Sequence, residues 1–374
     1  MTIIFVNALN AKAGGGKSIL TNFLSLLSNT ATEDRYIILV PDALAYRRYK
    51  CEHIRIMGLP RLCNNILFFP LVNRMILPLL VKKNACKLVF NLADVPIPTS
   101  AFQIFLFDWP YAVFPESPVW RMMDYKSWLV RKTKLYYFKK YLKYVDLMIA
   151  QTFLMKERLE KLYRLQHVEV VPNAVSLDNI NVQTTRDFHL GDGLKLLYLT
   201  HYYPHKNLEV FLPLAKEILA RNEKIRIIIT ISPEQHPRAL IFLQQIEQLG
   251  LQCVIHNVGP VTMKDVPSLY AQTDGLLMPT LLESFSGTYV EAMFHGKPIY
   301  TSDLDFAKAV CADAAYYFDP FNPLQILERI LESINDPEGK KLKIKKGKQV
   351  LDGLPTWEKV FHSYLQLFKK ASKR

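Results

Sequence analysis

Two glutamates eight residues apart form the pattern in this sequence that is best suited to chemistry. Glu283 lies in a predicted loop after an apolar strand, and Glu291 lies in the helix that is predicted to follow. At the predicted start of that helix lie Gly287 and the small residues Ser284, Ser286 and Thr288. Free N–H groups at a helix start favour a phosphate or diphosphate, and carboxylates orient sugar hydroxyls through strong hydrogen bonds. The pattern indicates a sugar–diphosphate site; alternatively, Glu283 caps the helix and Glu291 makes a surface ion pair.

Short apolar strands alternate with helical patterns along the chain, which is typical of βαβ units and parallel sheets. The first half predicts strands at Ile3–Val6, Ile37–Val40, Lys87–Phe90, Gln103–Phe107, Leu147–Ala150 and Val168–Val171, with a glycine loop before a helix over Ser18–Leu27. The second half predicts strands at Leu194–Leu199, Ile225–Ile231, Cys253–His256, Gly275–Met278 and Pro298–Tyr300. The polar stretch Ser176–Gly193 is the predicted linker. The fold class is therefore α/β, with two doubly wound, Rossmann-like domains facing a cleft, where ligands are expected.

Composition excludes several classes of protein. Of the 374 residues, 50% are apolar, enough to bury a core, which excludes disordered and fibrous proteins. The five cysteines are widely spaced without a C-x-x-C pair, which argues against a disulfide framework and fits a reducing cytosol. The N-terminus MTIIFVN is not that of a signal peptide, and no run of about 18 apolar residues predicts a membrane span. We therefore expect a cytoplasmic protein.

The net charge of +13 is concentrated in two segments. Residues 121–144 hold eight bases against one acid, and residues 338–374 hold eleven bases against three acids. In the first segment aromatic side chains, such as Trp128 and Tyr136, alternate with the bases. This pattern is compatible with an anionic membrane surface or with nucleic acid. It is equally compatible with a solvated helix whose aromatic face packs on its own domain.

The order of the motifs resembles that of retaining glycosyltransferase family 4, which has the GT-B fold. The resemblance covers most of the chain and is strongest over residues 195–320. It rests on E-x7-E after a strand, followed by Ala292-Met293 and the helix stop Gly296-Lys297-Pro298. Four further segments fall in the family's order: Val171-Pro172-Asn173-Ala174 at the interdomain turn, His205-Lys206-Asn207 at the phosphate-binding lysine, Asn257-Val258-Gly259 with Leu269-Tyr270 at the base-binding edge, and Trp357-Glu358 at the start of the final helix.

The resemblance implies a role for each matching residue. Glu283 would hold the hydroxyls of the donor sugar, Lys206 would neutralise the leaving diphosphate, and Glu291 would bind the ribose. The backbone of Phe285–Thr288 beside Ser284 would hold sugar and diphosphate, Val258 would line the base, and Gly15 and Gly16 would form the glycine loop of the first domain. Residues 1–178, completed by the helix 355–374, would form the acceptor-binding domain, and residues 194–350 the nucleotide-sugar-binding domain. The family needs no metal or other cofactor.

Two positions depart from the family pattern. The family's arginine, five residues before the lysine, is His201 in this chain. A neutral histidine donates one hydrogen bond and lacks the fixed fork of arginine. Where the first domain usually offers a histidine, this chain has Asp108. Asp108 would orient or deprotonate the acceptor hydroxyl or stabilise positive charge on the sugar; alternatively, it is a turn residue before Trp109-Pro110.

The expected function is a retaining, metal-independent glycosyltransferase of bacterial surface polysaccharide (O-antigen or capsule type) biosynthesis. Its donor would be a nucleotide-diphospho sugar, with UDP slightly ahead of GDP, and its acceptor a glycan, lipid-linked, at the inner face of the plasma membrane, with no nucleic acid partner. One rival is a P-loop NTP-dependent phosphotransferase, because Gly16-Lys17-Ser18 ends a relaxed P-loop pattern between a strand and a helix. Another is a non-catalytic basic protein that binds membranes or nucleic acid. Asp303-Leu304-Asp305 resembles a D-x-D metal motif but is better explained as a helix cap.

Overall fold

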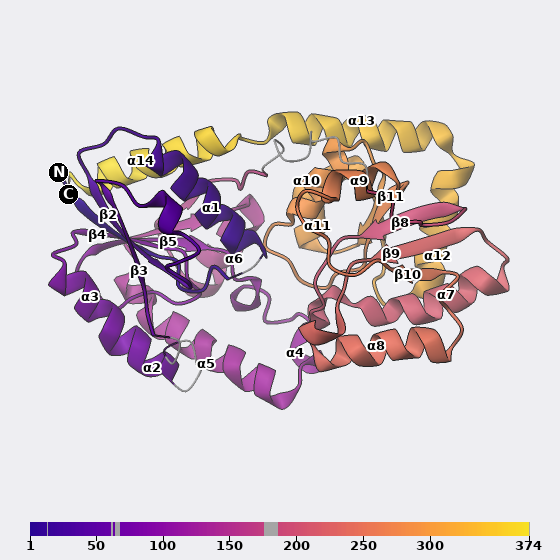
Figure 1. Cartoon of the computed structure of the whole chain (residues 1–374), viewed down its shortest axis with the longest axis horizontal. Coiled ribbons are helices and arrows are strands. Elements are labelled where there is room, and N and C mark those ends of the chain that lie inside the picture. Colours follow the sequence, from indigo (N-terminus) through magenta and orange to yellow (C-terminus); the bar gives the residue numbers. More distant parts are fainter. Residues whose placement is uncertain (13, 61–62, 64–67, 176–185, 374) are drawn as a thin grey trace. The chain divides into compact units, whose positions relative to one another are not determined.

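The chain forms two compact units (Figure 1). The computed structural model describes residues 1–374 except 13, 61–62, 64–67, 176–185 and 374. Unit 1 comprises Met1–Pro115, Asp124–Ala174 and Pro355–Arg374, and unit 2 comprises Glu116–Met123 and Val175–Leu354. The sequence assigned Glu116–Met123 to the first domain, but this short segment packs with unit 2. Of the predicted linker Ser176–Gly193, residues 176–185 lie outside the described residues.

Unit 1 is built on a seven-stranded parallel sheet of order β3-β2-β1-β4-β5-β6-β7. The strands are β1 (Ile3–Asn7), β2 (Arg35–Val40), β3 (Ile54–Gly58), β4 (Leu88–Asn91), β5 (Phe102–Phe107), β6 (Leu147–Ala150) and β7 (Val168–Val170). The strand order reverses between β1 and β4. Six of these strands were predicted; β3 was not, because its Arg55 is exposed and the strand lies at the sheet edge.

Alternate residues of the strands in unit 1 face two different layers of helices. Ile4 and Val6 of β1 belong to the core that contains α1 (Gly14–Ser28) and α14 (Trp357–Ala371). Phe5 belongs to the opposite core, which contains side chains of the π-helical turn η4 (Val72–Ile76) and of α3 (Leu77–Lys83); the short α2 (Phe69–Leu71) precedes them. The remaining helices of unit 1 are α5 (Tyr125–Tyr141) and α6 (Phe153–Tyr163). The period-two alternation of a strand explains how one strand supplies both cores.

Helix α1 begins earlier than predicted. The glycines Gly14–Gly16 form its first turn, instead of a loop before a helix that starts at Ser18. The buried side of α1, which includes Phe23, packs against α14. The first turn is glycine-rich and largely exposed. Because it lacks apolar residues, the pattern of the sequence did not predict that the helix includes it.

Unit 2 has a six-stranded parallel sheet of order β10-β9-β8-β11-β12-β13. Its strands are β8 (Leu194–Tyr198), β9 (Ile225–Ile229), β10 (Ile255–Asn257), β11 (Gly275–Met278), β12 (Ile299–Ser302) and β13 (Ala315–Phe318). Its helices are α4 (Val119–Met122), α7 (Phe211–Ala220), α8 (Pro237–Gln248), α9 (Val266–Ala271), α10 (Gly287–Phe294), α11 (Asp305–Cys311), α12 (Pro323–Asn335) and α13 (Pro337–Gly353). In this sheet the strand order reverses between β8 and β11.

The last helix, α14, is held in unit 1 by aromatic side chains. Phe368 is buried, with its ring 5.0 Å from that of Phe90 on β4 and 6.4 Å from that of Phe23 on α1. Tyr364 and Phe361, about one and two turns earlier, also contact Phe23. The final residues of the chain therefore complete the core of the unit that its first residues begin.

Among the described residues, no helix combines the length and the apolar character needed to cross a bilayer.

We predict that Phe368→Ala destabilises unit 1 by about 3–5 kcal/mol, because it removes a buried ring from an aromatic cluster. Urea denaturation followed by tryptophan fluorescence reports mainly on this unit, since Trp109, Trp128 and Trp357 lie in it. Phe153→Ala, at an exposed position of α6 in the same unit, is the matched control and should change stability by less than about 0.5 kcal/mol. An equal, small effect of both substitutions would contradict the packing described for α14.

Candidate active site

The reversal of strand order in unit 2 brings together two loops that are distant in sequence. Strands β8 and β11 are neighbours, and the loops that follow them leave the same edge of the sheet. The loop after β8 carries Lys206, in the 3-10 turn η8 (Pro204–Lys206), and the loop after β11 carries Glu283. The Lys206 ammonium forms an ion pair with the Glu283 carboxylate, and each side chain is 14% exposed. Two of the predicted site residues therefore meet at the place where doubly wound sheets bind ligands.

Hydrogen bonds tie these two loops together. The Leu281 N–H donates to the His205 carbonyl at 2.8 Å, and the Thr280 hydroxyl donates to the same carbonyl at 3.1 Å. The buried Asn207 amide donates to the carbonyls of Pro279, at 3.2 Å, and Pro320, at 2.8 Å. Lys206 and Glu283 are thus fixed by backbone contacts as well as by their own ion pair.

Asn207 and Thr280 were not among the predicted site residues. Asn207 has a φ of 55°, a left-handed conformation that asparagine tolerates better than most residues, and it ends the turn that presents Lys206. Thr280 also donates a hydrogen bond to the Glu283 carboxylate, at 3.3 Å. Both residues orient a predicted site residue through contacts between loops, so spacing in the sequence carried no signal for them.

Helix α10 begins directly after the Glu283 loop. Ser286 is its N-cap residue in an extended conformation, and the Ser286 side chain makes no capping hydrogen bond. The helix therefore starts without a side-chain acceptor from its N-cap residue, and its first N–H groups point out of the helix start. Ser284, Phe285, Gly287 and Thr288 surround this start and are all partly exposed. A helix that follows the Glu283 loop and contains Glu291 was predicted from the sequence, and α10 (Gly287–Phe294) confirms it.

Glu291 lies on α10, where burial raises the pKa of its carboxyl to about 7. The Tyr270 hydroxyl, from α9, donates to its Oε2 at 3.3 Å, which opposes the rise. Tyr270 also stacks on His295, with ring centroids 4.6 Å apart, and burial and the nearby Lys297 lower the pKa of His295 to about 4. Tyr270 thereby fixes Glu291 from a second helix, and a carboxyl that titrates near neutrality is typical of functional sites.

The other two predicted donor-site residues follow strands at the same sheet edge. His201, after β8, is exposed, and its Nδ1 lies 2.7 Å from the Gln235 amide nitrogen. Val258, after β10, donates its N–H to the Ile229 carbonyl at 3.0 Å. All predicted residues of the donor site that come from the second half of the chain thus lie on unit 2, on loops at the carboxyl ends of strands or on α10.

Asp108 and the glycines lie together in unit 1. Asp108 follows β5, and a Cβ atom added to Gly16 would lie 3.6 Å from its Oδ2, so the glycine backbone approaches this carboxyl closely. Gly15, next to it, is exposed. Burial, with a smaller contribution from the negative charge of Asp94, raises the pKa of Asp108 to about 7, and Lys134 opposes the rise. Asp108 can therefore either hold or accept a proton near neutral pH.

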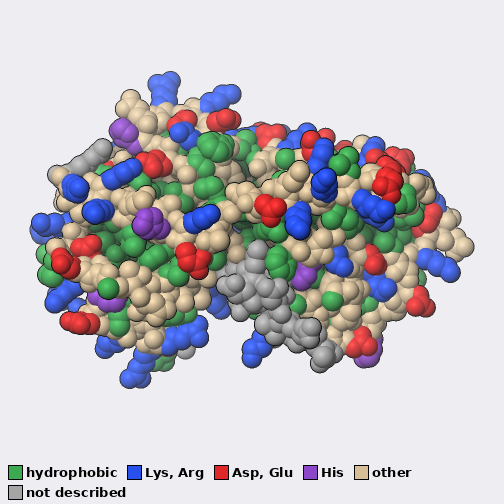
Figure 2. Space-filling model, turned by 90° about the horizontal axis from the view of Figure 1, so that it is seen from above, with side chains coloured by type: hydrophobic (Ala, Val, Ile, Leu, Met, Phe, Trp, Pro, Cys, Tyr) green, Lys and Arg blue, Asp and Glu red, His purple; other side chains and the backbone are tan. Residues whose placement is uncertain are grey.

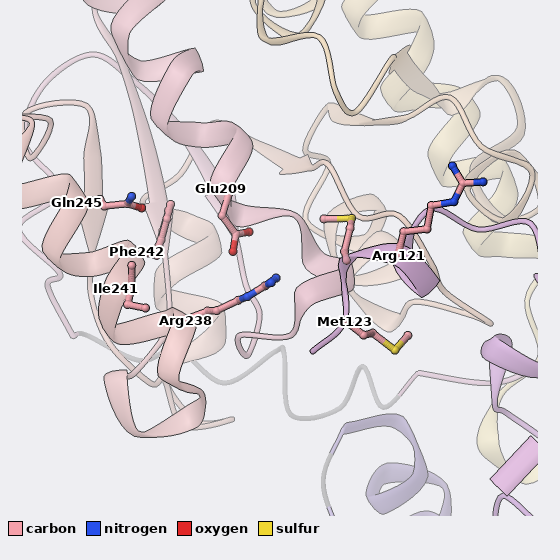
Figure 3. A pocket seen from close by; sticks show the side chains of 8 residues that line it. Arg121, Met123, Glu209, Arg238, Ile241, Phe242 and Gln245 are labelled. Carbon is pink, nitrogen blue, oxygen red and sulfur yellow. The ribbon is translucent and has the colours of Figure 1, made fainter. Parts of the chain in front are cut away.

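Two cavities lie within the units. In unit 1, a cavity of about 180 Å³ opens where the strand order reverses, lined among others by Asn7, Asn10, Lys12, Asn73 and Lys134. In unit 2, a cavity of about 460 Å³ is lined by Arg121, Met122, Met123, Glu209, Arg238, Ile241, Phe242 and Gln245 (Figure 3). None of the predicted site residues lines the cavity in unit 2, although α4, which supplies part of its wall, contacts the turn that carries Lys206.

The described residues contain no group of three His, Cys, Asp or Glu side chains arranged to hold a metal. Asp303, in the D-x-D sequence, is paired with Lys308 at 2.5 Å.

Solved structures with this arrangement of sheets have the GT-B fold. Sucrose-phosphate synthase from Thermosynechococcus elongatus superimposes with a TM-score of 0.75 at 14% identity, over 99% of both chains. A glycosyltransferase from Rickettsia africae gives a TM-score of 0.71 at 16% identity, over 100% of this chain and 99% of that one. The expectation of a GT-B fold is confirmed.

Sequence comparison supports the glycosyltransferase family 4 resemblance. Residues 185–350, which lie in unit 2, match the family described as glycosyl transferases group 1. O-antigen chain mannosyltransferase B of Escherichia coli is 26% identical over 151 residues, which are 40% of this chain and 39% of that protein. O-antigen chain mannosyltransferase RfbU of Salmonella typhimurium is 22% identical over 175 residues, which are 46% of each chain. The chain thus spans less than half the length of either curated relative.

We predict that affinity for UDP rises with pH and levels off above about pH 8, because ionised Glu291 would accept hydrogen bonds from ribose hydroxyls more strongly than the neutral carboxyl does. The pKa of about 7 in the unliganded protein sets the upper end of this rise, and binding should release a proton over the same pH range. In Glu291→Gln this part of the pH dependence should disappear. Calorimetric titration of both proteins measures it, and the ionisation of UDP itself cancels in the comparison. Parallel pH profiles would exclude Glu291 from the nucleotide site.

Proposed function

We propose that the protein is a retaining, metal-independent glycosyltransferase that moves a sugar from a nucleotide-diphospho sugar to a glycan acceptor. The observation that carries this proposal is the Lys206–Glu283 pair at the reversal of strand order, beside the start of α10. At one sheet edge, a cation and a helix start match the anionic phosphates of a sugar diphosphate, and a carboxylate matches the hydroxyls of its sugar.

The ion pair explains how the unliganded site holds two charges with little exposure. Breaking a buried ion pair is costly unless both charges gain new partners. In the proposed complex, Lys206 turns from Glu283 to the diphosphate, and Glu283 accepts hydrogen bonds from the donor sugar. The backbone of Phe285–Thr288 contacts sugar and diphosphate, and Glu291, oriented by Tyr270, accepts from the ribose. Binding of the donor thus replaces the ion pair between Lys206 and Glu283 by several contacts between the protein and the donor.

Charge neutralisation by the chain itself supports the absence of a metal from the proposed reaction. Lys206 and the N-terminal dipole of α10 stabilise the charge that develops on the leaving diphosphate. His201, which lies on the same loop as Lys206, accepts a hydrogen bond from the Gln235 amide at Nδ1, which leaves its Nε2–H as a donor for the diphosphate. The leaving diphosphate then takes the proton of the acceptor hydroxyl, and attack from the same face retains the anomeric configuration.

For the acceptor side we propose unit 1, with Asp108 near the acceptor hydroxyl or the developing positive charge of the sugar. Its raised pKa and its position beside Gly16 support a role in chemistry over one as a turn residue. The cavity at the strand reversal of this unit, with its amides and lysines, suits the hydroxyls of a glycan.

We further propose a role in bacterial surface polysaccharide biosynthesis, with a lipid-linked acceptor at the inner face of the plasma membrane. The two curated relatives are named as O-antigen mannosyltransferases, which supports a hexosyl donor. We place UDP ahead of GDP as the nucleotide; competition between the two for the same site decides it.

The carboxylate and the lysine are tested separately. Glu283→Gln should lower the rate of sugar transfer by roughly 10²-fold or more, because it removes the charged acceptor of the sugar hydroxyls. Lys206→Ala should weaken UDP binding about tenfold or more, since a hydrogen bond to a charged group is lost. Glu328→Gln and Lys216→Ala, at exposed positions of the same unit, are the matched controls. They should change neither the rate of sugar transfer nor the affinity for UDP. Normal turnover of the Glu283 variant would overturn the proposal.

Two properties of the reaction distinguish this mechanism from its alternatives. Turnover should persist in EDTA, because Lys206 and α10 replace the metal. NMR of the product before mutarotation should show the anomeric configuration of the donor. Loss of activity that Mg²⁺ restores, or an inverted product, would contradict the mechanism while leaving the fold assignment intact.

A further inference from the structure

The helical run Phe69–Lys83 has apolar side chains on both of its sides. Its inner side, represented by Val72, Leu77 and Val81, is buried in the core of unit 1. On its outer side Leu71, Met75 and Leu79 recur every four residues, so they form one stripe along the helix. Their exposures are 43%, 53% and 60%. Large aliphatic side chains grouped in this way mark an interaction site rather than the scattered exposure of an ordinary surface.

The neighbouring helix α5 presents aromatic side chains and lysines outward. Phe138 and Tyr141 on its inner side are buried, so part of the aromatic pattern does pack on the unit itself. Tyr125, Trp128, Leu129 and Tyr136 are nevertheless exposed. Lys132 lies over the ring of Trp128 and Lys140 over that of Tyr136, 5.6 Å and 5.5 Å from the ring centroids.

The helical run Phe69–Lys83 and α5 lie on the same side of the sheet of unit 1 (Figure 1). The rings of Phe69, at the start of the run, and Tyr137, on α5, lie 5.8 Å apart. Phe138 of α5 contacts Phe105 of β5, which points away from the face covered by α1 and α14. We call the exposed residues of the run Phe69–Lys83 and of α5 the docking face.

The segments that carry the docking face are rich in bases. Residues 68–83 and 125–144 together contain ten Lys and Arg and no Asp or Glu, although Asp124 caps α5 and Lys134 pairs with Asp94 at 2.5 Å. The other basic segment differs: on α13, Lys346 pairs with Asp313, Lys341 pairs with Glu338, and Lys343 donates to the Ala315 carbonyl. Figure 2, which looks onto the face that carries α13, shows acidic and basic side chains interspersed there. Bases therefore exceed acids by more along the segments of the docking face than along α13.

We propose that the docking face binds an anionic bilayer, with Leu71, Met75 and Leu79 inserted below the headgroups and the lysines of α5 among them. Nucleic acid would use the lysines but gain nothing from three exposed aliphatic side chains. The surface of an anionic bilayer can bind the lysines at its headgroups and the aliphatic side chains below them. Aromatic rings such as that of Trp128 favour the boundary between headgroups and acyl chains. The inference deepens the proposed function, because it assigns the surface by which unit 1 would reach a lipid-linked acceptor.

Flotation of the full chain with vesicles of phosphatidylcholine and about one third phosphatidylglycerol tests the proposal. We expect binding that falls with added salt and that is absent from pure phosphatidylcholine vesicles. Met75→Ser with Leu79→Ser should lower the partition coefficient by about tenfold or more, because less apolar surface is buried in the bilayer. Lys126→Ala with Lys132→Ala and Lys139→Ala should lower it comparably at low salt.

Matched controls lie on unit 2. Leu219→Ser with Leu240→Ser removes two aliphatic side chains that are 45% and 47% exposed, and Lys341→Ala with Lys345→Ala and Lys348→Ala removes three exposed lysines of α13. Both variants should bind vesicles like the wild type. Equal losses in the control and docking-face variants would overturn the assignment of this surface.

Insertion is read from Trp128. Lipids brominated near the headgroup should quench tryptophan fluorescence of the wild type, and Trp128→Phe should remove most of that quenching. The proposal would be contradicted, and nucleic acid favoured, by two results together. An RNA oligonucleotide would bind as tightly as the vesicles, and Met75→Ser with Leu79→Ser would change neither RNA binding nor vesicle binding. The UDP affinity of the docking-face variants should be unchanged. A wild-type protein that binds UDP normally but does not bind the anionic vesicles would refute this inference alone.

Discussion

The meeting of Lys206 and Glu283 at the strand reversal of unit 2 is the interaction on which the proposed chemistry depends. Neither residue lies near the other in sequence; neighbouring strands β8 and β11 bring their loops to one edge of the sheet. The carbonyl of His205, which accepts from Thr280 and Leu281, and the buried amide of Asn207 then hold the loops at a fixed spacing. A site with opposite charges in this position is prepared for a ligand that is anionic at one end and rich in hydroxyls at the other.

Desolvation gives both units a carboxyl that titrates near neutral pH. In unit 2 it is Glu291, whose Tyr270 partner fixes its orientation, and in unit 1 it is Asp108, beside the first turn of α1. The cost of keeping such groups buried is repaid when a ligand supplies hydrogen bonds or charge. In the proposed reaction, the carboxyl of unit 2 would accept hydrogen bonds from hydroxyls of the donor, and the carboxyl of unit 1 would exchange a proton.

Apolar patterning was sufficient to predict most of the sheet in both units and the helix that carries Glu291. Elements with weak patterning escaped: β3 has a single fully buried residue, Ile54, and the first turn of α1 is made of glycines. Tertiary contacts were equally invisible, since Asn207, Thr280 and Tyr270 act through loops or helices that only the folded chain brings together. The segment Glu116–Met123 shows the same limit, because its sequence gives no sign that it packs with unit 2.

Hydrogen–deuterium exchange with UDP, in the absence of metal, tests the central claim most directly, because it locates the nucleotide on the chain without relying on turnover. The account predicts slower exchange in the segments 200–208 and 283–292, which surround Lys206 and the start of α10. Protection confined to residues 11–18, with no change at those two segments, would place the nucleotide at the glycine-rich turn of α1 and contradict the account.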